Sequence, residues 1–188
     1  MSEHSNFLPK TTDCKKYTLF IDRDGVINQP IIDDYAKNPS EFILCEGAIE
    51  ALNVLKLMFK RIILVTNQQG IGKQVMTSQD LENVHLKMYD TMKTEINSYF
   101  DLVLYAPYLK TDSHSWRKPN TGMLLKAKEY YPDIDFSKSI MVGDSPGDMA
   151  LADQLNILKV RISNDQFEFD NQDFIYTDLA SFVTALSN

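Results

Sequence analysis

The chain has 188 residues, of which 44% are hydrophobic and 24% charged, and its formal net charge is −7. This size and composition predict one folded domain with a buried core and exclude a disordered chain. The acidic balance and the lack of a dense Lys/Arg run argue against a nucleic-acid-binding surface. A small anionic substrate stays compatible with the charge, because a bound cation and a few basic side chains determine the local field.

The two cysteines, Cys14 and Cys45, are too few for a disulfide framework, so both are expected as reduced thiols. The opening residues lack the apolar core of a signal peptide, and no apolar run is long enough to span a bilayer. We therefore expect a cytoplasmic protein without membrane contact, and a monomer by default. Residues 1–16 are expected to form a flexible segment, and residues 17–188 a single domain.

Short apolar runs alternate with longer amphipathic stretches, which is typical of βα units that build a mostly parallel sheet. Strands are predicted at 17–22, 61–67, 102–107, 139–144, 157–162 and 174–178, several of them nearly continuous in apolar residues. Helices are predicted over 46–59, from Thr77 toward Phe100, over 121–131, after Gly147 and over 178–186. The pattern indicates a three-layer α/β fold with helices on both faces of the sheet.

Polar residues follow several of these strands, at the edge where open parallel sheets bind ligands. Asp22 and Asp24 end the first strand two residues apart, so their carboxylates face one side if the extended geometry continues. Two close carboxylates repel each other unless they share a proton or a cation. A turn at Asp24-Gly25 explains the same residues, so the pair alone leaves both interpretations open.

Two further groups of polar residues also allow both a functional and a structural interpretation. Thr66 and Asn67 end the second strand and precede Gln68, and their hydroxyl and amide groups can donate to phosphate oxygens. A polar loop that caps a helix is the alternative for this segment. Arg117 and Lys118 form a cationic pair before a proline that restricts the backbone. Basic pairs are also common on solvated surfaces, so this indication is weak by itself.

Asp144 ends the fourth strand, and Asp148 lies four residues further along, at the start of a predicted helix. Either residue can favour a helix N-terminus. Asp144 nevertheless adds a third carboxylate to the sheet edge that carries Asp22 and Asp24. Three clustered acids favour a hard divalent cation, and Mg²⁺ suits them because it takes oxygen ligands, several waters and a substrate phosphate oxygen.

The segments DRDG, VTNQ, RKP and GDSPGD occur in the order of the four motifs of the haloacid dehalogenase (HAD) superfamily, which the chain resembles between residues 17 and 153. FIDRDGVIN, VTNQQGIG, RKPNTGML and MVGDSPGDM are most similar to its D-glycero-D-manno-heptose 1,7-bisphosphate 7-phosphatases and histidinol-phosphate phosphatases. The resemblance implies a Rossmann-like HAD fold with a short flap over residues 28–40 and no inserted cap domain.

The chain departs from this group in two places. The loop before RKP has no cysteine and only His114, so no structural zinc is expected. The loop over residues 106–116 shapes the substrate entrance in the group, and its change leaves the substrate open. Thr121 stands where the group often has proline, and RKPNTGM is in this respect also similar to polynucleotide 3′-phosphatases. Heptose bisphosphate, histidinol phosphate and a 3′-phosphorylated polynucleotide are therefore the substrate alternatives.

The resemblance implies a phosphomonoester hydrolase that works through an aspartyl-phosphate. Asp22 is expected to attack phosphorus, and Asp24 to protonate the leaving group and then to accept a proton from water. Mg²⁺ is expected to be held by Asp22, by Asp144 and by the backbone carbonyl of Asp24. Thr66 and Lys118 are expected to stabilise the phosphate oxygens.

The remaining expectations concern the surroundings of this centre. Asp148 is expected to orient Lys118 or a metal-bound water. Four residues are expected to contact the substrate, namely Tyr35 in the flap, Asn67, Gln68 and Arg117. A receiver-like signalling domain is the non-enzymatic alternative, but receivers carry their phospho-acceptor after the third strand, where LVLYAP ends without an acid. The sequence therefore favours an enzyme that acts on a small phosphate ester.

Overall fold

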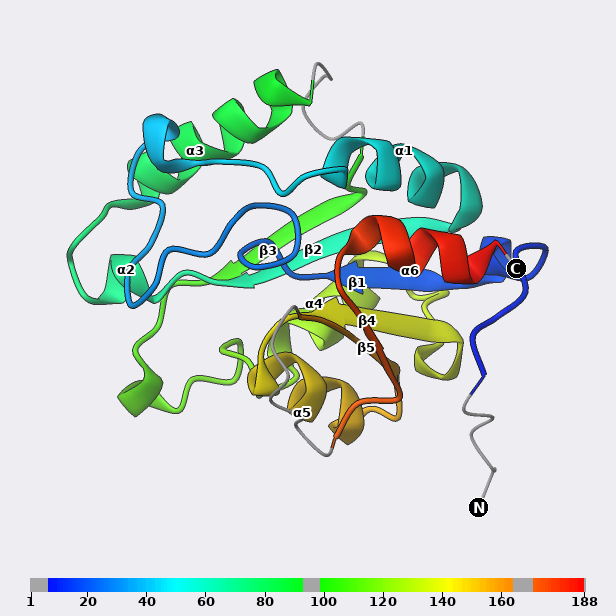
Figure 1. Ribbon diagram of the computed structural model, residues 1–188. Helices are drawn as coiled ribbons and strands as arrows, with labels where there is room; N and C mark the ends of the chain where they lie inside the picture. The colour runs from blue at the N-terminus through cyan, green and yellow to red at the C-terminus, as the bar shows by residue number, and fades with distance from the viewer. Residues whose placement is uncertain (1–6, 93–98, 164–170, 188) are drawn as a thin grey trace.

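The computed structural model describes residues 7–92, 99–163 and 171–187, and its centre is a six-stranded sheet (Figure 1). The strands are β1 (Thr18–Ile21), β2 (Arg61–Asn67), β3 (Leu102–Ala106), β4 (Ser139–Gly143), β5 (Leu158–Ile162) and β6 (Phe174–Tyr176). Their order in the sheet is β3-β2-β1-β4-β5-β6, and every neighbouring pair is parallel. The predicted parallel α/β sheet is confirmed.

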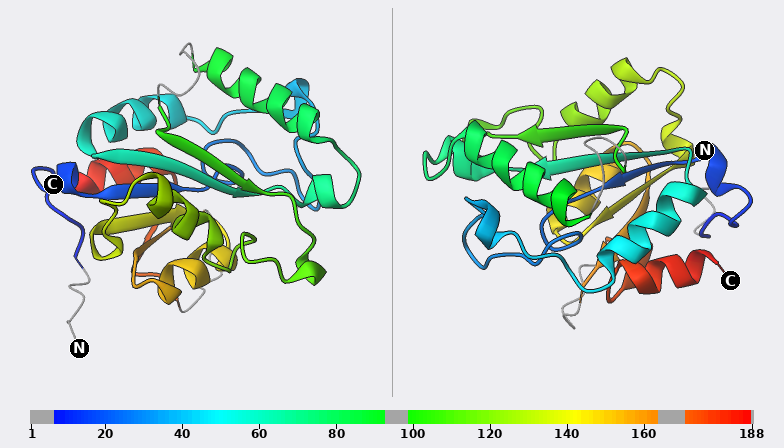
Figure 2. Two further views of the ribbon diagram at one scale, coloured as in Figure 1. Left: turned by 180° about the vertical axis from the view of Figure 1, so that it is seen from behind. Right: turned by 90° about the horizontal axis from the view of Figure 1, so that it is seen from above.

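Helices cover both faces of this sheet. They are α1 (Ala48–Met58), α2 (Gln69–Gly72), α3 (Ser78–Thr91), α4 (Gly122–Tyr130), α5 (Pro146–Gln154) and α6 (Leu179–Leu186). Figures 1 and 2 show α1, α3 and α6 on one face and α4 and α5 on the other. One core cluster joins Leu52 of α1 to Phe182 of α6, and a second contains Leu124 of α4 and Leu151 of α5. The predicted three layers are therefore confirmed.

The central strands are buried on both faces. Leu19 and Ile21 of β1 pack in the core below α1 and α6, whereas Phe20 packs in the core of α4 and α5. Successive side chains alternate in this way because a strand points them to opposite faces. Every residue of β1 and β4 is buried. The apolar runs in the sequence thus reflect burial on both sides of a parallel sheet.

The register brings the carboxyl ends of the central strands together. Ile21, the last residue of β1, pairs with Leu64 of β2 and with Val142 of β4. The N–H of Asp22 donates to the carbonyl oxygen of Val142 at 2.9 Å, so the alignment with β4 continues one residue beyond β1. The residues that follow β1, β2 and β4 therefore meet at one edge of the sheet.

The helix predicted from Thr77 toward Phe100 is shorter in the structure. It begins with a capping box between Thr77 and Asp80 and ends at Thr91. Residues 93–98 lie outside the described residues, and Phe100 is buried in the core just before β3. Phe100 therefore belongs to the approach to β3 and not to the helix.

Two short helical features also differ from the expectation. Helix α5 begins at Pro146, before Gly147, because Ser145 and Asp148 form a capping box around its first turn. Helix α2 was not expected, since four residues are too few to show a helical period.

The flap between Asn28 and Ser40 contains a single short helical turn, Pro39–Glu41, which confirms a short flap without an inserted cap domain. Residues 1–6 of the segment expected to be loose lie outside the described residues, and the expectation is corrected for the remainder, up to residue 16. The Cys14 side chain is fully buried in the core, and the hydroxyl of Thr11 donates to the carbonyl of Leu186 at 2.6 Å. In the described part of the chain, no helix is both long and apolar enough to cross a membrane.

Candidate active site

Asp22 lies at the end of β1 and points toward Lys118. Its Oδ1 accepts a hydrogen bond from the N–H of Arg23 at 2.7 Å, and its Oδ2 lies 2.8 Å from Lys118 Nζ. Only 10% of the Asp22 side chain is exposed. The carboxylate is therefore held in one orientation at the sheet edge by neighbours on both of its oxygens.

Lys118 is the buried cation of the site. Its Nζ lies 2.8 Å from Asp22 and 2.6 Å from Asp148, and it donates to the carbonyl oxygen of Val65 at 3.0 Å. These three acceptors match the three N–H groups of an ammonium. Burial lowers the pKa of Lys118, but the two carboxylates outweigh burial and raise it above its ordinary value. Lys118 is therefore charged throughout the physiological pH range.

Asn67 holds the backbone of Lys118. Its Oδ1 accepts the N–H of Lys118 at 3.0 Å, and its Nδ2 donates to the Lys118 carbonyl at 3.1 Å. Both polar ends of the side chain are thus engaged within the protein. The role of Asn67 as a substrate contact stays a prediction, and in the structure its bonds support the loop that carries the buried lysine.

Asp24 is surrounded by donors. Arg23 Nη2 donates to both carboxylate oxygens at 2.9 and 3.1 Å, Asn28 Nδ2 donates at 3.0 Å, and Gln68 Nε2 donates at 2.8 Å. Burial raises the pKa of Asp24, but Arg23 and the hydrogen bonds outweigh burial and hold the pKa below its ordinary value. The Asp24 side chain nevertheless keeps a relative exposure of 32%. Asp24 is therefore fixed in position while one side stays accessible.

Gln68 connects Asp24 to Thr66. The same Nε2 that donates to Asp24 also lies 3.0 Å from Thr66 Oγ1, and both Gln68 and Thr66 are buried. The role of Gln68 as a substrate contact stays a prediction. In the structure its buried side chain bonds to Asp24, a contact that the sequence did not indicate.

Three carboxylates meet next to Lys118. One oxygen from each of Asp22, Asp144 and Asp148 lies within 4.8 Å of the others. Both oxygens of Asp148 are already used, Oδ1 by Lys118 and Oδ2 by the hydroxyl and N–H of Ser145. Asp148 thus contacts Lys118 and Ser145 and leaves Asp22 and Asp144 facing a common position.

Two glycines make room for these carboxylates. A Cβ at Gly25 would lie 2.0 Å from Asp144 Oδ2, and a Cβ at Gly143 would lie 2.3 Å from Asp148 Cγ. Gly25 also has a positive φ of 80°, a conformation that other residues rarely adopt. Both acids therefore pack directly against backbone that only glycine leaves open.

The cluster is electrostatically incomplete without a cation. Burial, together with repulsion from Asp148 and Asp24, raises the pKa of Asp22 to about 7 against the opposing effect of Lys118. Burial and repulsion from Asp22 and Asp148 raise the pKa of Asp144 to about 8. A hard divalent cation between Asp22 and Asp144 removes this repulsion, so the donor set fits Mg²⁺.

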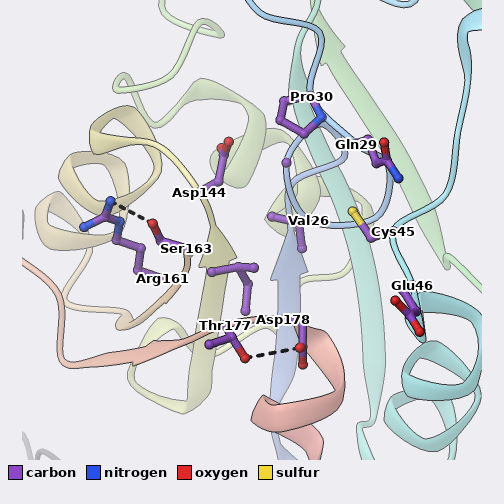
Figure 3. A pocket seen from close by; sticks show the side chains of 12 residues that line it. Val26, Gln29, Pro30, Cys45, Glu46, Asp144, Arg161, Ser163, Thr177 and Asp178 are labelled. Carbon is purple, nitrogen blue, oxygen red and sulfur yellow. Dashed lines mark hydrogen bonds between the residues drawn. The ribbon is translucent and has the colours of Figure 1, made fainter. Parts of the chain in front are cut away.

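A cavity of about 570 Å³ lies beside Asp144 (Figure 3). Val26 and Gln29, which follow β1, form part of its wall, and Arg161 of β5 and Asp178 before α6 form another part. Arg161 is buried, and its Nη2 donates to Ser163 Oγ at 3.1 Å. The acidic cluster is therefore bordered by open space on the side of Asp144.

Tyr35 and Arg117 lie at the outer part of the site. The Tyr35 hydroxyl accepts a hydrogen bond from Gln69 Nε2 at 3.1 Å, and Arg117 Nη1 donates to the Tyr108 carbonyl at 3.3 Å. Burial lowers the pKa of Arg117, while the nearby Tyr35 opposes the effect. Both side chains keep part of their surface exposed. Of the four predicted substrate contacts, Tyr35 and Arg117 thus lie outside the buried hydrogen-bond network around Asp24 and Lys118, whereas Asn67 and Gln68 belong to it.

Three supporting residues were missed in the sequence. Arg23 is fully buried and pairs with Asp24, Asn28 donates to the same carboxylate, and Gln69 joins two loops. A signal existed for Arg23, because a charged residue between two strand-end acids is either exposed or paired with one of them. No local pattern identified Asn28 or Gln69.

The parallel sheet and the residues at its carboxyl edge define a phosphatase of the HAD superfamily. The sequence pattern of the family described as polynucleotide kinase 3 phosphatase matches residues 19–184, so the chain belongs to this family.

Two relatives are similar to most of this chain. The chain is 34% identical over 137 residues to a D-glycero-alpha-D-manno-heptose-1,7-bisphosphate 7-phosphatase of Mycobacterium bovis, covering 73% of this chain and 72% of that protein. It is 31% identical over 152 residues to the histidine biosynthesis bifunctional protein HisB of Buchnera aphidicola, covering 80% of this chain but 42% of that protein.

A solved structure shares the fold. The D,D-heptose 1,7-bisphosphate phosphatase of B. bronchiseptica, complexed with magnesium and phosphate, superposes with a TM-score of 0.77 at 24% identity. The match covers 90% of this chain and 97% of that one.

Proposed function

We propose that the protein is a Mg²⁺-dependent phosphomonoester hydrolase that forms an aspartyl-phosphate on Asp22. The observation that carries the proposal is the buried ammonium of Lys118 between Asp22 and Asp148. It holds Asp22 in one orientation and supplies positive charge where a phosphate oxygen would approach. A fixed carboxylate beside a fixed cation suits in-line attack on phosphorus, because the charge that develops is stabilised without rearrangement.

Asp22 and Asp144 would hold Mg²⁺, with the backbone carbonyl of Asp24 as the expected third protein ligand. The bound ion would supply charge neutralisation between the attacking carboxylate and the phosphate oxygens. The close fit of Asp144 against Gly25 and the raised pKa values of Asp22 and Asp144 support this assignment.

Asp24 serves as the acid and base of the proposed reaction. It first gives a proton to the leaving oxygen, and after the aspartyl-phosphate has formed it takes a proton from the attacking water. The donors around Asp24 fix its direction and favour its charged form. Protonation for the first step therefore requires the negative charge of the incoming phosphate nearby, which raises the pKa of the carboxyl group.

We propose heptose 1,7-bisphosphate as the substrate, with the 7-phosphate as the group removed. The supporting observation is the likeness to the named Mycobacterium bovis phosphatase, which extends over nearly three quarters of both chains. Tyr35 and Arg117, at the outer part of the site, are the proposed contacts for the alcohol portion. A polynucleotide 3′-phosphatase is the second candidate, favoured by the family description and opposed by the net charge of −7.

The test is Mg²⁺-dependent phosphate release from a panel of four substrates. The panel holds heptose 1,7-bisphosphate, histidinol phosphate, a 3′-phosphorylated oligonucleotide and p-nitrophenyl phosphate, and ³¹P NMR identifies which heptose phosphate is removed. We expect the largest kcat/KM with the heptose and loss of its 7-phosphate. A preference for histidinol phosphate or for the oligonucleotide would contradict the proposed substrate while leaving the chemistry intact.

A further inference from the structure

A short helix joins two loops at the outer part of the site. Helix α2 lies between the flap, residues 28–40, and the segment of residues 107–116 that follows β3, which we name the mouth loop (Figure 1). Gln69, its first residue, donates from Nε2 to the Tyr35 hydroxyl at 3.1 Å. Its Oε1 accepts the backbone N–H of Lys110 at 2.7 Å. One side chain thus bonds to both loops.

The backbone of α2 packs against the same two loops. A Cβ at Gly70 would lie 3.0 Å from the Tyr35 ring, and a Cβ at Gly72 would lie 2.5 Å from the carbonyl oxygen of Pro107. These approaches leave no room for larger residues at either position. The flap and the mouth loop therefore both pack against α2, and the Gln69 side chain adds one hydrogen bond to each loop.

Two of the proposed substrate contacts lie in or next to these loops. Tyr35 belongs to the flap, and Arg117 follows the mouth loop and donates to the Tyr108 carbonyl within it. Burial lowers the pKa of Arg117 and Tyr35 opposes the effect, which places the Tyr35 hydroxyl within electrostatic range of the guanidinium. The ammonium of Lys73 lies 5.3 Å from the Tyr35 ring centre, a distance suited to a cation–π contact. The relative position of the loops therefore sets the spacing of these side chains.

We propose that Gln69 is a positioning residue that latches the flap to the mouth loop and thereby determines affinity for the part of the substrate beyond the reacting phosphate. The proposal rests on the proposed function for the roles of Tyr35 and Arg117. Gln69 lies outside the network of Asp22, Asp24 and Lys118, so its loss changes the entrance and leaves the reacting groups in place.

The latch itself is tested without substrate, by amide hydrogen exchange in Gln69→Ala. The Lys110 amide is expected to exchange about two- to tenfold faster, because it loses its acceptor. Amides of residues 29–38 are expected to lose protection in parallel. Gln69→Glu keeps an acceptor for the Lys110 amide and for the Tyr35 hydroxyl. In this variant the Lys110 and flap amides are therefore expected to exchange at the wild-type rate. Unchanged exchange in Gln69→Ala would overturn the latch.

A second variant separates the two halves of the latch. Tyr35→Phe removes the hydroxyl that Gln69 bonds, while the bond from Lys110 to Gln69 is kept. Only the flap amides are then expected to exchange faster. Gln79→Ala is the matched control, since Gln79 is exposed and, among the described residues, its side chain bonds to Glu82 and Asn83 within α3. Faster exchange of both loops in the control would assign the effect to general destabilisation and overturn the proposal.

Kinetics test the consequence for the substrate. For Gln69→Ala we expect KM for the panel substrate that the wild type favours to rise about tenfold, with kcat within about twofold. The kcat/KM for p-nitrophenyl phosphate is expected to stay within about twofold, since its leaving group is short. Equal losses on both substrates, or no loss on either, would overturn the specificity role. If the wild type prefers another substrate, the proposed substrate is contradicted. The role of Gln69 in joining the two loops is still tested, because the hydrogen-exchange experiment needs no substrate.

Discussion

Replacing Gly25 by alanine tests whether Asp144 is a metal ligand. The new Cβ would lie 2.0 Å from Asp144 Oδ2, whereas ordinary contact begins at 3.4 Å. The carboxylate must therefore move by about 1.4 Å, the difference between these distances. Mg²⁺ requires its oxygen ligands at about 2.0–2.1 Å in near-ideal geometry, so such a shift removes Asp144 as a ligand.

The expected result is at least about tenfold weaker Mg²⁺ binding, which corresponds to about 1.4 kcal/mol. Isothermal titration calorimetry with Mg²⁺ measures it directly. Alanine at a positive φ also costs roughly 1–2 kcal/mol of folding free energy, so a control must share that cost. Gly47→Ala supplies it, because Gly47 has a φ of 70° and a Cβ there would lie 3.6 Å from its nearest neighbour, Ala180.

Both variants are expected to lose similar stability in urea unfolding, and only Gly25→Ala is expected to lose Mg²⁺ affinity. Wild-type Mg²⁺ affinity in Gly25→Ala would refute the placement of the ion at Asp144. An equal loss of affinity in Gly47→Ala would show that general destabilisation, and not the carboxylate, causes the effect.

Three further predictions concern the charged groups of the site. Lys118→Ala leaves Asp22 and Asp148 buried without their cation, so urea unfolding should show a loss of about 3–5 kcal/mol; wild-type stability would contradict the pairing. Asp24→Asn should turn over slowly and accumulate phosphoenzyme in a quenched reaction, and an unchanged rate would remove Asp24 from proton transfer. The folded pKa values of Asp22, about 7, and Asp144, about 8, lie above the ordinary 3.8. Their contribution to stability is therefore complete below about pH 4 and is lost as the pH rises through 7 to 8. The Tm of the metal-free protein should fall over this range and recover with saturating Mg²⁺, whereas a pH-independent Tm would show that the acids are not coupled.

The sequence predicted the sheet and its acidic edge because these depend on local patterns. Buried parallel strands are continuous in apolar residues, so their ends can be located, and residues after β1, β2 and β4 must meet at one edge. Asp22, Asp24, Thr66 and Asp144 were placed at this edge in this way, whereas Lys118 lies in a loop and was only a weak indication until the resemblance gave it a role. The order of DRDG, VTNQ, RKP and GDSPGD along the chain made the assignment to the HAD superfamily specific.

The direction of the amide side chains could not be predicted. Asn67 bonds the backbone of Lys118, which is 51 residues away in sequence, and Gln68 bonds Asp24 across 44 residues. Such partners are set by the tertiary fold, and an amide at a strand end is equally able to bind substrate or protein. The same reason explains why Gln69, whose partners lie in two separate loops, was missed.

The N-terminal segment shows a second limit. The polar residues before β1 predicted a loose segment, but the buried thiol of Cys14 and the bond from Thr11 to Leu186 hold it against the end of α6. Pro9 and Cys14 are buried five residues apart, and two isolated buried residues have no period to detect.

The central claim is that Asp22 carries the phosphoryl group during turnover. We would mix the enzyme with Mg²⁺ and heptose 1,7-bisphosphate, quench in acid within one turnover and map the peptides by mass spectrometry. The account predicts one phosphoryl group on the peptide that contains Asp22, its disappearance as phosphate is released, and neither signal in Asp22→Asn. Phosphate release without any labelled peptide, or release that persists in Asp22→Asn, would contradict the account.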